Sequence, residues 1–147
     1  MTTLPHTHYH QNYDTKLYSQ SNTNPICSAK DAHKLLKEHF NPHVEEFWGI
    51  YLNHHLKLLN LSLLTRGTLN NCPIHPRDLF REAITHNSFT IILAHNHVSH
   101  SLEPSNTDIK TTRKLKKCGE LLEIPILDHI IFNSEEYYSF KEHQSIF

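Results

Sequence analysis

The sequence predicts an α/β domain with a mixed β-sheet, and two observations support this prediction. Segments with apolar residues at helical spacing alternate along the chain with short runs of aromatic and β-branched residues. Two of those runs, 89–94 and 126–132, are almost wholly apolar, which is typical of strands covered on both faces. Helices that interleave with strands favour an α/β fold with helices packed on a sheet.

Three helices are expected, each with a recognisable beginning. Ser28 is a suitable N-cap for the first helix, which an Asn-Pro pair at 41–42 would end. Pro76 is placed to begin the second helix. The third helix is expected to begin at Pro104-Ser105 and to continue to about Leu122, because apolar residues recur there at helical spacing.

Five strands are expected between and after these helices. The first two form a pair joined by a turn at 53–55, and the third and fourth are the apolar runs already described. The expected strands are 46–52, 56–66, 89–94, 126–132 and 137–140.

The length of 147 residues fits one domain. Residues 1–26 are expected to be a flexible polar arm, and residues 27–147 the folded domain. The arm carries alternating histidines at His6, His8 and His10, which could also bind a transition metal on an extended segment.

Charge and cysteine content indicate which partners and which cellular compartment to expect. A formal net charge of -1 gives no indication of a nucleic-acid or membrane surface as partner. No secretory signal or membrane-spanning run is visible, which predicts a soluble protein. The cysteines Cys27, Cys72 and Cys118 have no paired spacing, so a reducing cytoplasm is expected.

The chemistry of the chain is expected around His95, His97 and Asp108. The two histidines follow directly on the third expected strand, and side chains at i and i+2 of an extended segment point the same way. Asp108 lies in the first turn of the third expected helix, from which its carboxylate can turn back toward the strand end. Two histidines and one carboxylate are the protein ligands of a catalytic zinc, with a fourth position left for water.

Simpler explanations exist for each part of this trio. Ser105 and Asp108 form a capping box for the helix, which alone accounts for the carboxylate. Histidines two apart can also occur by chance in a chain with 15 of them. The combination of a buried strand, His-Asn-His and a helix beginning Pro-Ser-x-x-Asp favours the metal site.

A hydrolytic zinc site needs further groups. Zinc lowers the pKa of its bound water to about 7, and a general base then takes the proton of that water. Glu45 and Glu46, at the start of the first long strand, are the acidic candidates for that base. Ser105 is a candidate donor to the oxyanion that forms on the attacked carbonyl.

These residues resemble a known family pattern. His95, His97, Ser105 and Asp108 fit the H-x-H-x7-S-x2-D motif of JAMM-type (MPN-plus) metallopeptidases. The chain is most similar to the RadC-like branch over about residues 26–143. The segments that carry this similarity are 66–70, 75–77, 92–97, 127–131 and 138–140.

The resemblance implies a fold and a site. The fold would be a single JAMM/MPN-type, cytidine-deaminase-like domain with a mixed sheet flanked by about three helices. Zinc would bind His95, His97 and Asp108, and Ser105 would support the oxyanion. The family also uses a glutamate just before the first long strand, which corresponds to Glu45 here. Glu46 stays the alternative, since alternation along a strand lets only one of them face the metal.

The chain departs from the family pattern in two places. RadC-like proteins usually read Pro-Ser-Gly after His-Asn-His, whereas this chain reads Val98-Ser99-His100. His100 is either an additional imidazole near the metal or a solvent-facing loop residue. Residues 1–26 are too short for the helix-hairpin-helix domain that RadC-like proteins often carry, which weakens the family's link to DNA repair.

Asp128 and His129, within the fourth expected strand, have two interpretations. They either orient a ligand histidine from behind the metal site or only pack and form hydrogen bonds.

The sequence therefore favours a zinc-dependent hydrolase of peptide or isopeptide bonds, with an unidentified substrate. The alternative is a non-catalytic metal-binding or interaction module for protein or DNA. A nuclease is disfavoured because the chain is near neutral and lacks an evident groove of basic and aromatic residues.

Overall fold

The computed structural model describes residues 24–67, 74–99, 101–143 and 146–147. Their strands form one five-stranded sheet in the order β2-β1-β3-β4-β5. β3 and β4 run parallel and the other neighbouring pairs antiparallel, so the predicted α/β class with a mixed sheet is confirmed. The strands are β1 (Glu45–Leu52), β2 (Leu58–Gly67), β3 (Thr90–Asn96), β4 (Ile126–Phe132) and β5 (Tyr137–Ser139).

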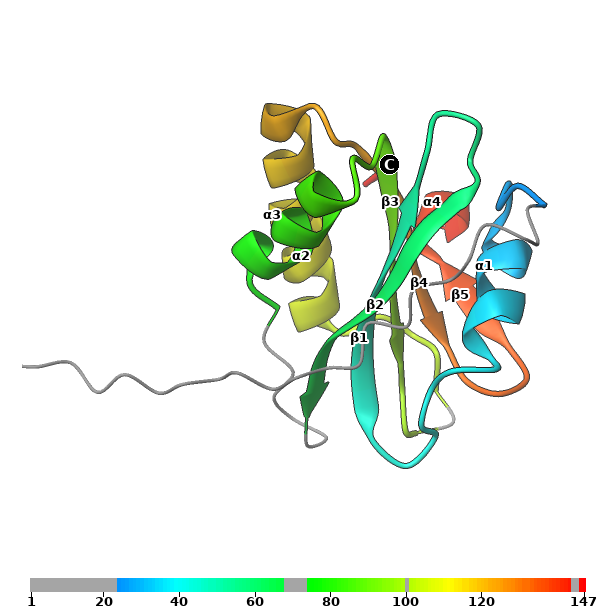
Figure 1. Ribbon diagram of the computed structural model, residues 1–147. Coiled ribbons are helices and arrows are strands. Elements are labelled where there is room, and N and C mark those ends of the chain that lie inside the picture. Colours follow the sequence, from blue (N-terminus) through cyan, green and yellow to red (C-terminus); the bar gives the residue numbers. More distant parts are fainter. Residues whose placement is uncertain (1–23, 68–73, 100, 144–145) are drawn as a thin grey trace, which may run out of the picture.

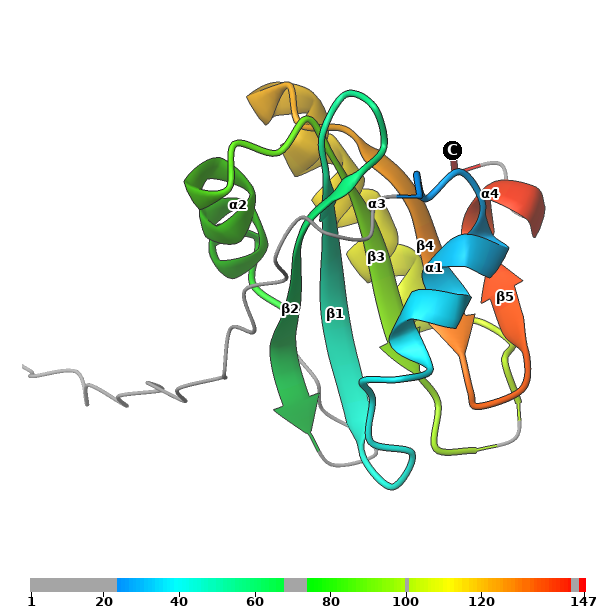
Figure 2. The ribbon, with the colours of Figure 1, turned by 45° about the vertical axis from the view of Figure 1, so that its right-hand side comes forward.

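Helices cover both faces of this sheet (Figures 1 and 2). α2 and α3 lie against one face, and α1 lies against the other. The sequence predicts about three flanking helices. The structure has a fourth, the single-turn helix α4, which directly follows β5. The helices are α1 (Ala29–Leu36), α2 (Pro76–Thr85), α3 (Asn106–Leu122) and α4 (Phe140–His143). Within the described residues, no helix has the length and apolar character needed to cross a bilayer.

The predictions for the N-terminal arm, Cys72 and His100 fall almost entirely on residues outside these ranges. The predicted helix beginnings at Ser28, Pro76 and Ser105 are confirmed. Ser28 and Ser105 each form a capping box, and Pro76 is the first residue of α2.

The central strand β3 positions the candidate site. All seven of its residues are buried, as its apolar sequence predicts. Ile91 and Leu93 pack into the core under α2 and α3, while Ile92 and Ala94 pack into the core under α1. Because side chains alternate along a strand, His95 continues the row of Ile91 and Leu93 toward α3.

Several element boundaries differ from those expected; β3, for example, is Thr90–Asn96 where 89–94 is expected. α1 ends at Leu36, before Asn41-Pro42, and a turn follows in which the His39 ring contacts the Leu35 carbonyl. The turn before β2 extends past residue 55, because the Asn53 side chain accepts the Lys57 amide and Leu56 has a left-handed φ of 58°.

A further difference lies at the end of β5. Phe140 was expected in the last strand, but it begins α4. The Ser139 hydroxyl accepts the Glu142 amide, and the Asp128 carboxylate accepts the Lys141 amide. Side chains thus bind the amides of this turn, which favours a helical turn over a continued strand.

Candidate metal centre

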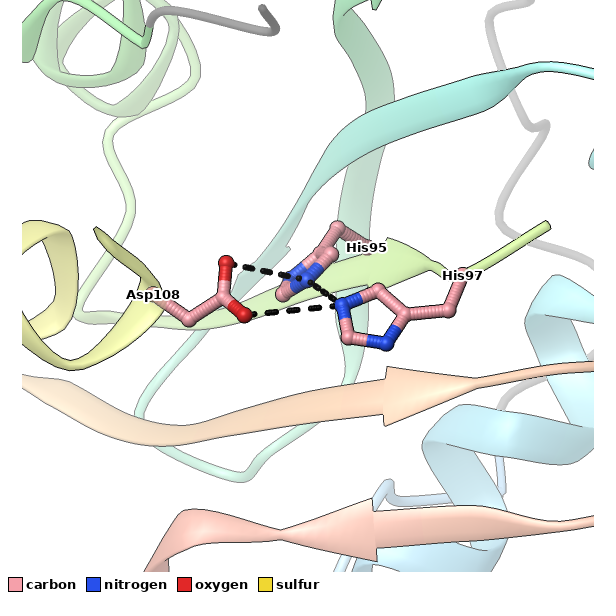
Figure 3. A group of neighbouring side chains, drawn as sticks. All are labelled: His95, His97 and Asp108. Carbon is pink, nitrogen blue, oxygen red and sulfur yellow. Dashed lines mark hydrogen bonds and ion pairs between the residues drawn. The ribbon is translucent and has the colours of Figure 1, made fainter. Parts of the chain in front are cut away.

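Three predicted ligands meet at the end of β3 (Figure 3). The Nε2 atoms of His95 and His97 lie 2.9 Å apart. Asp108 Oδ1 lies 3.3 Å from His95 Nε2, and Asp108 Oδ2 lies 3.5 Å from His97 Nε2. One ligand atom from each residue fits within 4.8 Å of the others, and across the described part of the chain this is the one such group of three. The trio can therefore bind a metal ion.

Local structure explains this convergence. His97 is one residue past β3, yet its amide donates to the Phe132 carbonyl and continues the pairing with β4. His95 and His97 therefore keep the i, i+2 relation that points both rings to one side. Asp108 reaches them from the first turn of α3.

The capping box and the site use the same carboxylate. Asp108 Oδ2 accepts the Ser105 amide at 2.8 Å, and Ser105 Oγ accepts the Asp108 amide at 3.1 Å. Both carboxylate oxygens also face the histidine rings. The helix cap thus holds the Asp108 carboxylate in place at the site, and Ser105 lies next to it.

The charges of the trio are strongly coupled. Burial alone would raise the pKa of Asp108, but its contacts with His95 and His97 hold that pKa far below its usual range. Burial alone would lower the pKa of His97, yet the Asp108 carboxylate raises it on balance. Without a metal, the pair therefore favours a protonated His97 beside an ionised Asp108.

The two glutamates lie on opposite faces of β1. Phe47 pairs with His95 across β1 and β3, and the two rings stack at 5.8 Å. Glu45, two residues before Phe47, shares that face. Burial raises the pKa of Glu45, with smaller opposing effects of His97 and His95, so its carboxylate lies within electrostatic range of the site.

Glu46 belongs to a separate buried network on the other face. Its side chain is fully buried and pairs with Arg66, whose Nη2 lies 2.7 Å from Glu46 Oε1. Glu46 Oε2 accepts the Asn41 amide and the Trp48 indole N–H. Its backbone amide donates to the Asn96 side chain.

Asp128 and His129, although adjacent in sequence, also have different partners. His129 is fully buried, and its Nε2 lies 2.8 Å from His95 Nδ1, directly behind the candidate ligand. The Asp128 carboxylate instead accepts the Ser139 hydroxyl and the Lys141 amide, which join β5 to α4. Burial raises the pKa of Asp128 and lowers that of His129 well below its usual value.

Sequence reasoning missed Thr112. This buried residue lies one helical turn after Asp108, and its hydroxyl contacts His129 Nδ1 at 2.6 Å. The spacing of four from Asp108 was the available signal, because it places both residues on one face of α3.

The donor set fits a metal ion of intermediate softness. Two imidazole nitrogens and a carboxylate, mostly shielded from water, are typical protein ligands of zinc at a site with an open position. The Nδ1 atom of His97 lies 2.9 Å from the Ser101 carbonyl, an acceptor, so Nδ1 carries a proton. In the neutral ring, Nε2 then has the lone pair that a metal needs.

A helix-covered mixed sheet with a His-His-Asp group at the end of its central strand defines an α/β domain of the JAB/MPN type. The chain belongs to the family described as RadC-like JAB domain, which matches residues 26–145. The resemblance noted in the sequence is thereby confirmed.

Several relatives carry the name UPF0758 protein. The chain is 41% identical over 128 residues to one from Clostridium kluyveri, with 86% of this chain and 56% of the relative covered. It is 36% identical over 126 residues to one from Chlorobium chlorochromatii, covering 85% and 57%. UPF0758 protein SH1266 of Staphylococcus haemolyticus is 45% identical over 98 residues, covering 67% and 43%. The chain thus spans about half the length of these relatives.

Proposed function

We propose that this domain is a zinc-dependent hydrolase of peptide or isopeptide bonds. The observation that carries the proposal is the meeting of His95, His97 and Asp108 on the face of the sheet that also carries Glu45. JAB-family membership makes a metal-dependent hydrolase the function that this geometry supports best. The free thiols of Cys27 and Cys118 are compatible with a reducing cytoplasm as its location.

His95, His97 and Asp108 would hold the zinc ion. When bound there, zinc would supply a water of lowered pKa and a Lewis acid for the attacked carbonyl. The coupling between Asp108 and the two histidines keeps the carboxylate ionised, which is the state that a metal requires.

Glu45 is the residue proposed to accept a proton and later return it to the leaving amine. Its partial burial raises its pKa above the usual value of a glutamate, which makes the carboxylate a stronger base. Glu46 is not suited to this role, because Arg66 holds its carboxylate on the opposite face.

Ser105 is the proposed oxyanion donor. Its oxygen already accepts the Asp108 amide, which leaves the hydroxyl proton available for a substrate oxygen. The hydroxyl is exposed and adjacent to the ligand carboxylate. A peptide or isopeptide substrate is therefore proposed to bind over the beginning of α3.

The proposal is tested by zinc content and turnover measured on the same preparations. Fluorogenic peptide and ubiquitin-like isopeptide substrates are supplied to the zinc-loaded chain, with Glu45→Gln as the variant and Lys57→Gln as an exposed control. We expect Glu45→Gln to retain zinc and to lower kcat by about 100-fold or more, the usual contribution of a general base. Zinc binding without turnover of any substrate in the wild type would instead support a non-catalytic binding module.

A further inference from the structure

A continuous chain of hydrogen bonds runs behind the metal centre from α3 to β3. Thr112 Oγ1 lies 2.7 Å from the Asp108 carbonyl oxygen and 2.6 Å from His129 Nδ1. His129 Nε2 lies 2.8 Å from His95 Nδ1. Thr112 and His129 are both fully buried, so water does not compete for these contacts.

The direction of the protons along this chain follows from its first member. A backbone carbonyl oxygen only accepts hydrogen bonds, so the Thr112 hydroxyl proton points to the Asp108 carbonyl. Thr112 Oγ1 must then accept its second hydrogen bond, which requires a proton on His129 Nδ1.

The same logic passes through the two rings. A neutral imidazole has one N–H, so a proton on His129 Nδ1 leaves a lone pair on His129 Nε2. The contact between His129 Nε2 and His95 Nδ1 is then donated by His95. His95 Nε2, which faces Asp108 and His97, is left with a lone pair, so in the metal-free state the proton that faces the Asp108 carboxylate comes from His97 Nε2.

We propose that Thr112 and His129 are positioning residues that fix the tautomer of His95, so that its Nε2 lone pair points to the metal position. The inference rests on the proposed metal centre but not on the proposed hydrolysis. With the proton order reversed, His95 Nε2 would carry a hydrogen and could not bind a metal ion.

Aromatic stacking holds the same two rings in orientation. Phe47 stacks on His95 with an interplanar angle of 3°, and Phe140 stacks on His129 at 4.9 Å with an angle of 6°. The stacking limits rotation of the rings but does not distinguish their nitrogens. The hydroxyl of Thr112 is therefore the group that sets which nitrogen carries the proton.

The arrangement also couples two ligands through one helical turn. Asp108 supplies a carboxylate to the site and, through its carbonyl, accepts the Thr112 proton that begins the chain. The position of α3 thus determines both the carboxylate ligand and the state of His95.

The test uses Thr112→Val, which keeps the shape of the side chain without its hydroxyl, and Thr112→Ser, which restores the hydroxyl. The tautomer of His95 is read by long-range ¹H–¹⁵N NMR on the metal-free full chain at pH 8.5. Zinc affinity is measured separately by competition with a chromophoric chelator. Thermal unfolding verifies that each variant is folded.

We expect Nδ1-protonated His95 in the wild type and in Thr112→Ser. In Thr112→Val we expect a mixture of tautomers and a zinc affinity reduced about tenfold or more, the usual effect of removing a group that orients a metal ligand. If Thr112→Val does not fold, His129→Phe provides the comparison, because it removes the acceptor of the His95 Nδ1 proton.

Two results would overturn the inference. One is an Nε2-protonated His95 in the wild type, and the other is a Thr112→Val variant with unchanged tautomer and unchanged zinc affinity. A wild type that shows the expected tautomer but binds no zinc would support the tautomer assignment and count against the proposed metal centre. A wild type that shows the tautomer and binds zinc without turnover would count against the proposed hydrolysis alone.

Discussion

Replacement of Glu46 by glutamine is expected to destabilise the fold far more than the same change at Glu45. Glu46 Oε1 accepts two N–H groups of Arg66, at 2.9 Å from Nε and 2.7 Å from Nη2. Glu46 Oε2 accepts the Asn41 amide and the Trp48 indole N–H. All four contacts are donated to a carboxylate that is fully buried.

Glutamine cannot satisfy this set of donors. Its NH₂ group must face either the Arg66 guanidinium or the two N–H groups of Asn41 and Trp48, so two donors meet a donor. Two lost bonds to a charged group would cost about 3–6 kcal/mol at 1.5–3 kcal/mol each. The Arg66 side chain is 49% exposed, so water can rebind its donors. We therefore expect a loss of about 3 kcal/mol, out of the roughly 5–15 kcal/mol typical of a domain.

Glu45→Gln is the matched control. Burial raises the pKa of Glu45, so its ionised form is less favourable in the folded state than in the unfolded chain. Removing that charge should leave the free energy of unfolding within about 0.5 kcal/mol of the wild type, or raise it slightly.

Urea unfolding of the metal-free chain measures both variants. Unfolding is followed by the fluorescence of Trp48, the only tryptophan of the sequence. Circular dichroism serves as a second probe, because the Glu46 substitution changes the partner of the Trp48 indole N–H and can alter the fluorescence directly. A Glu46→Gln variant as stable as the wild type, or a Glu45→Gln variant that is the less stable of the two, would refute this assignment of the two glutamates to opposite faces.

Two further predictions concern stability. In the metal-free chain, the pKa of Asp108 is lower in the folded state, so its contribution to stability is lost as the pH falls below about 3.9, the pKa of an unfolded aspartate. The pKa of His97 is higher in the folded state, so its contribution is lost as the pH rises above about 6.5, the pKa of an unfolded histidine. Asp108→Asn should therefore cost most near pH 5.5, about 2 kcal/mol, and less at pH 8.5; an equal cost at both pH values in thermal melts would contradict the ion pair. Gly119→Ala should destabilise by about 1–3 kcal/mol in urea unfolding, since a Cβ there would lie 2.6 Å from the Ile124 carbonyl oxygen; a neutral effect would mean that the backbone around α3 yields easily.

Local signals were sufficient for most of the fold. Ser28 and Ser105 indicate where two helices begin, because each is a suitable N-cap, and the apolar run of β3 indicates a covered central strand. The three candidate ligands could be predicted from the sequence for the same reason. His95 and His97 are related by strand alternation, and Asp108 has a fixed place in a capped helix.

Features that depend on contacts between distant segments could not be predicted from the sequence. Glu45 and Glu46 are equivalent in sequence terms, and only the pairing of Phe47 with His95 across two strands decides which one shares the face of the site. His129 contacts His95 because β4 lies beside β3, and Thr112 joins them from α3. Such register and packing arise from tertiary structure, which no short window of sequence contains.

The most direct test of the account is the zinc content of the chain after metal loading and dialysis. We predict about one firmly bound zinc per chain for the wild type and one equivalent fewer for His97→Ala. The exposed His55→Ala serves as the control, since it should retain the zinc content of the wild type. A wild type that binds no zinc, or a His97→Ala variant that binds as much as the wild type, would contradict the proposed metal centre.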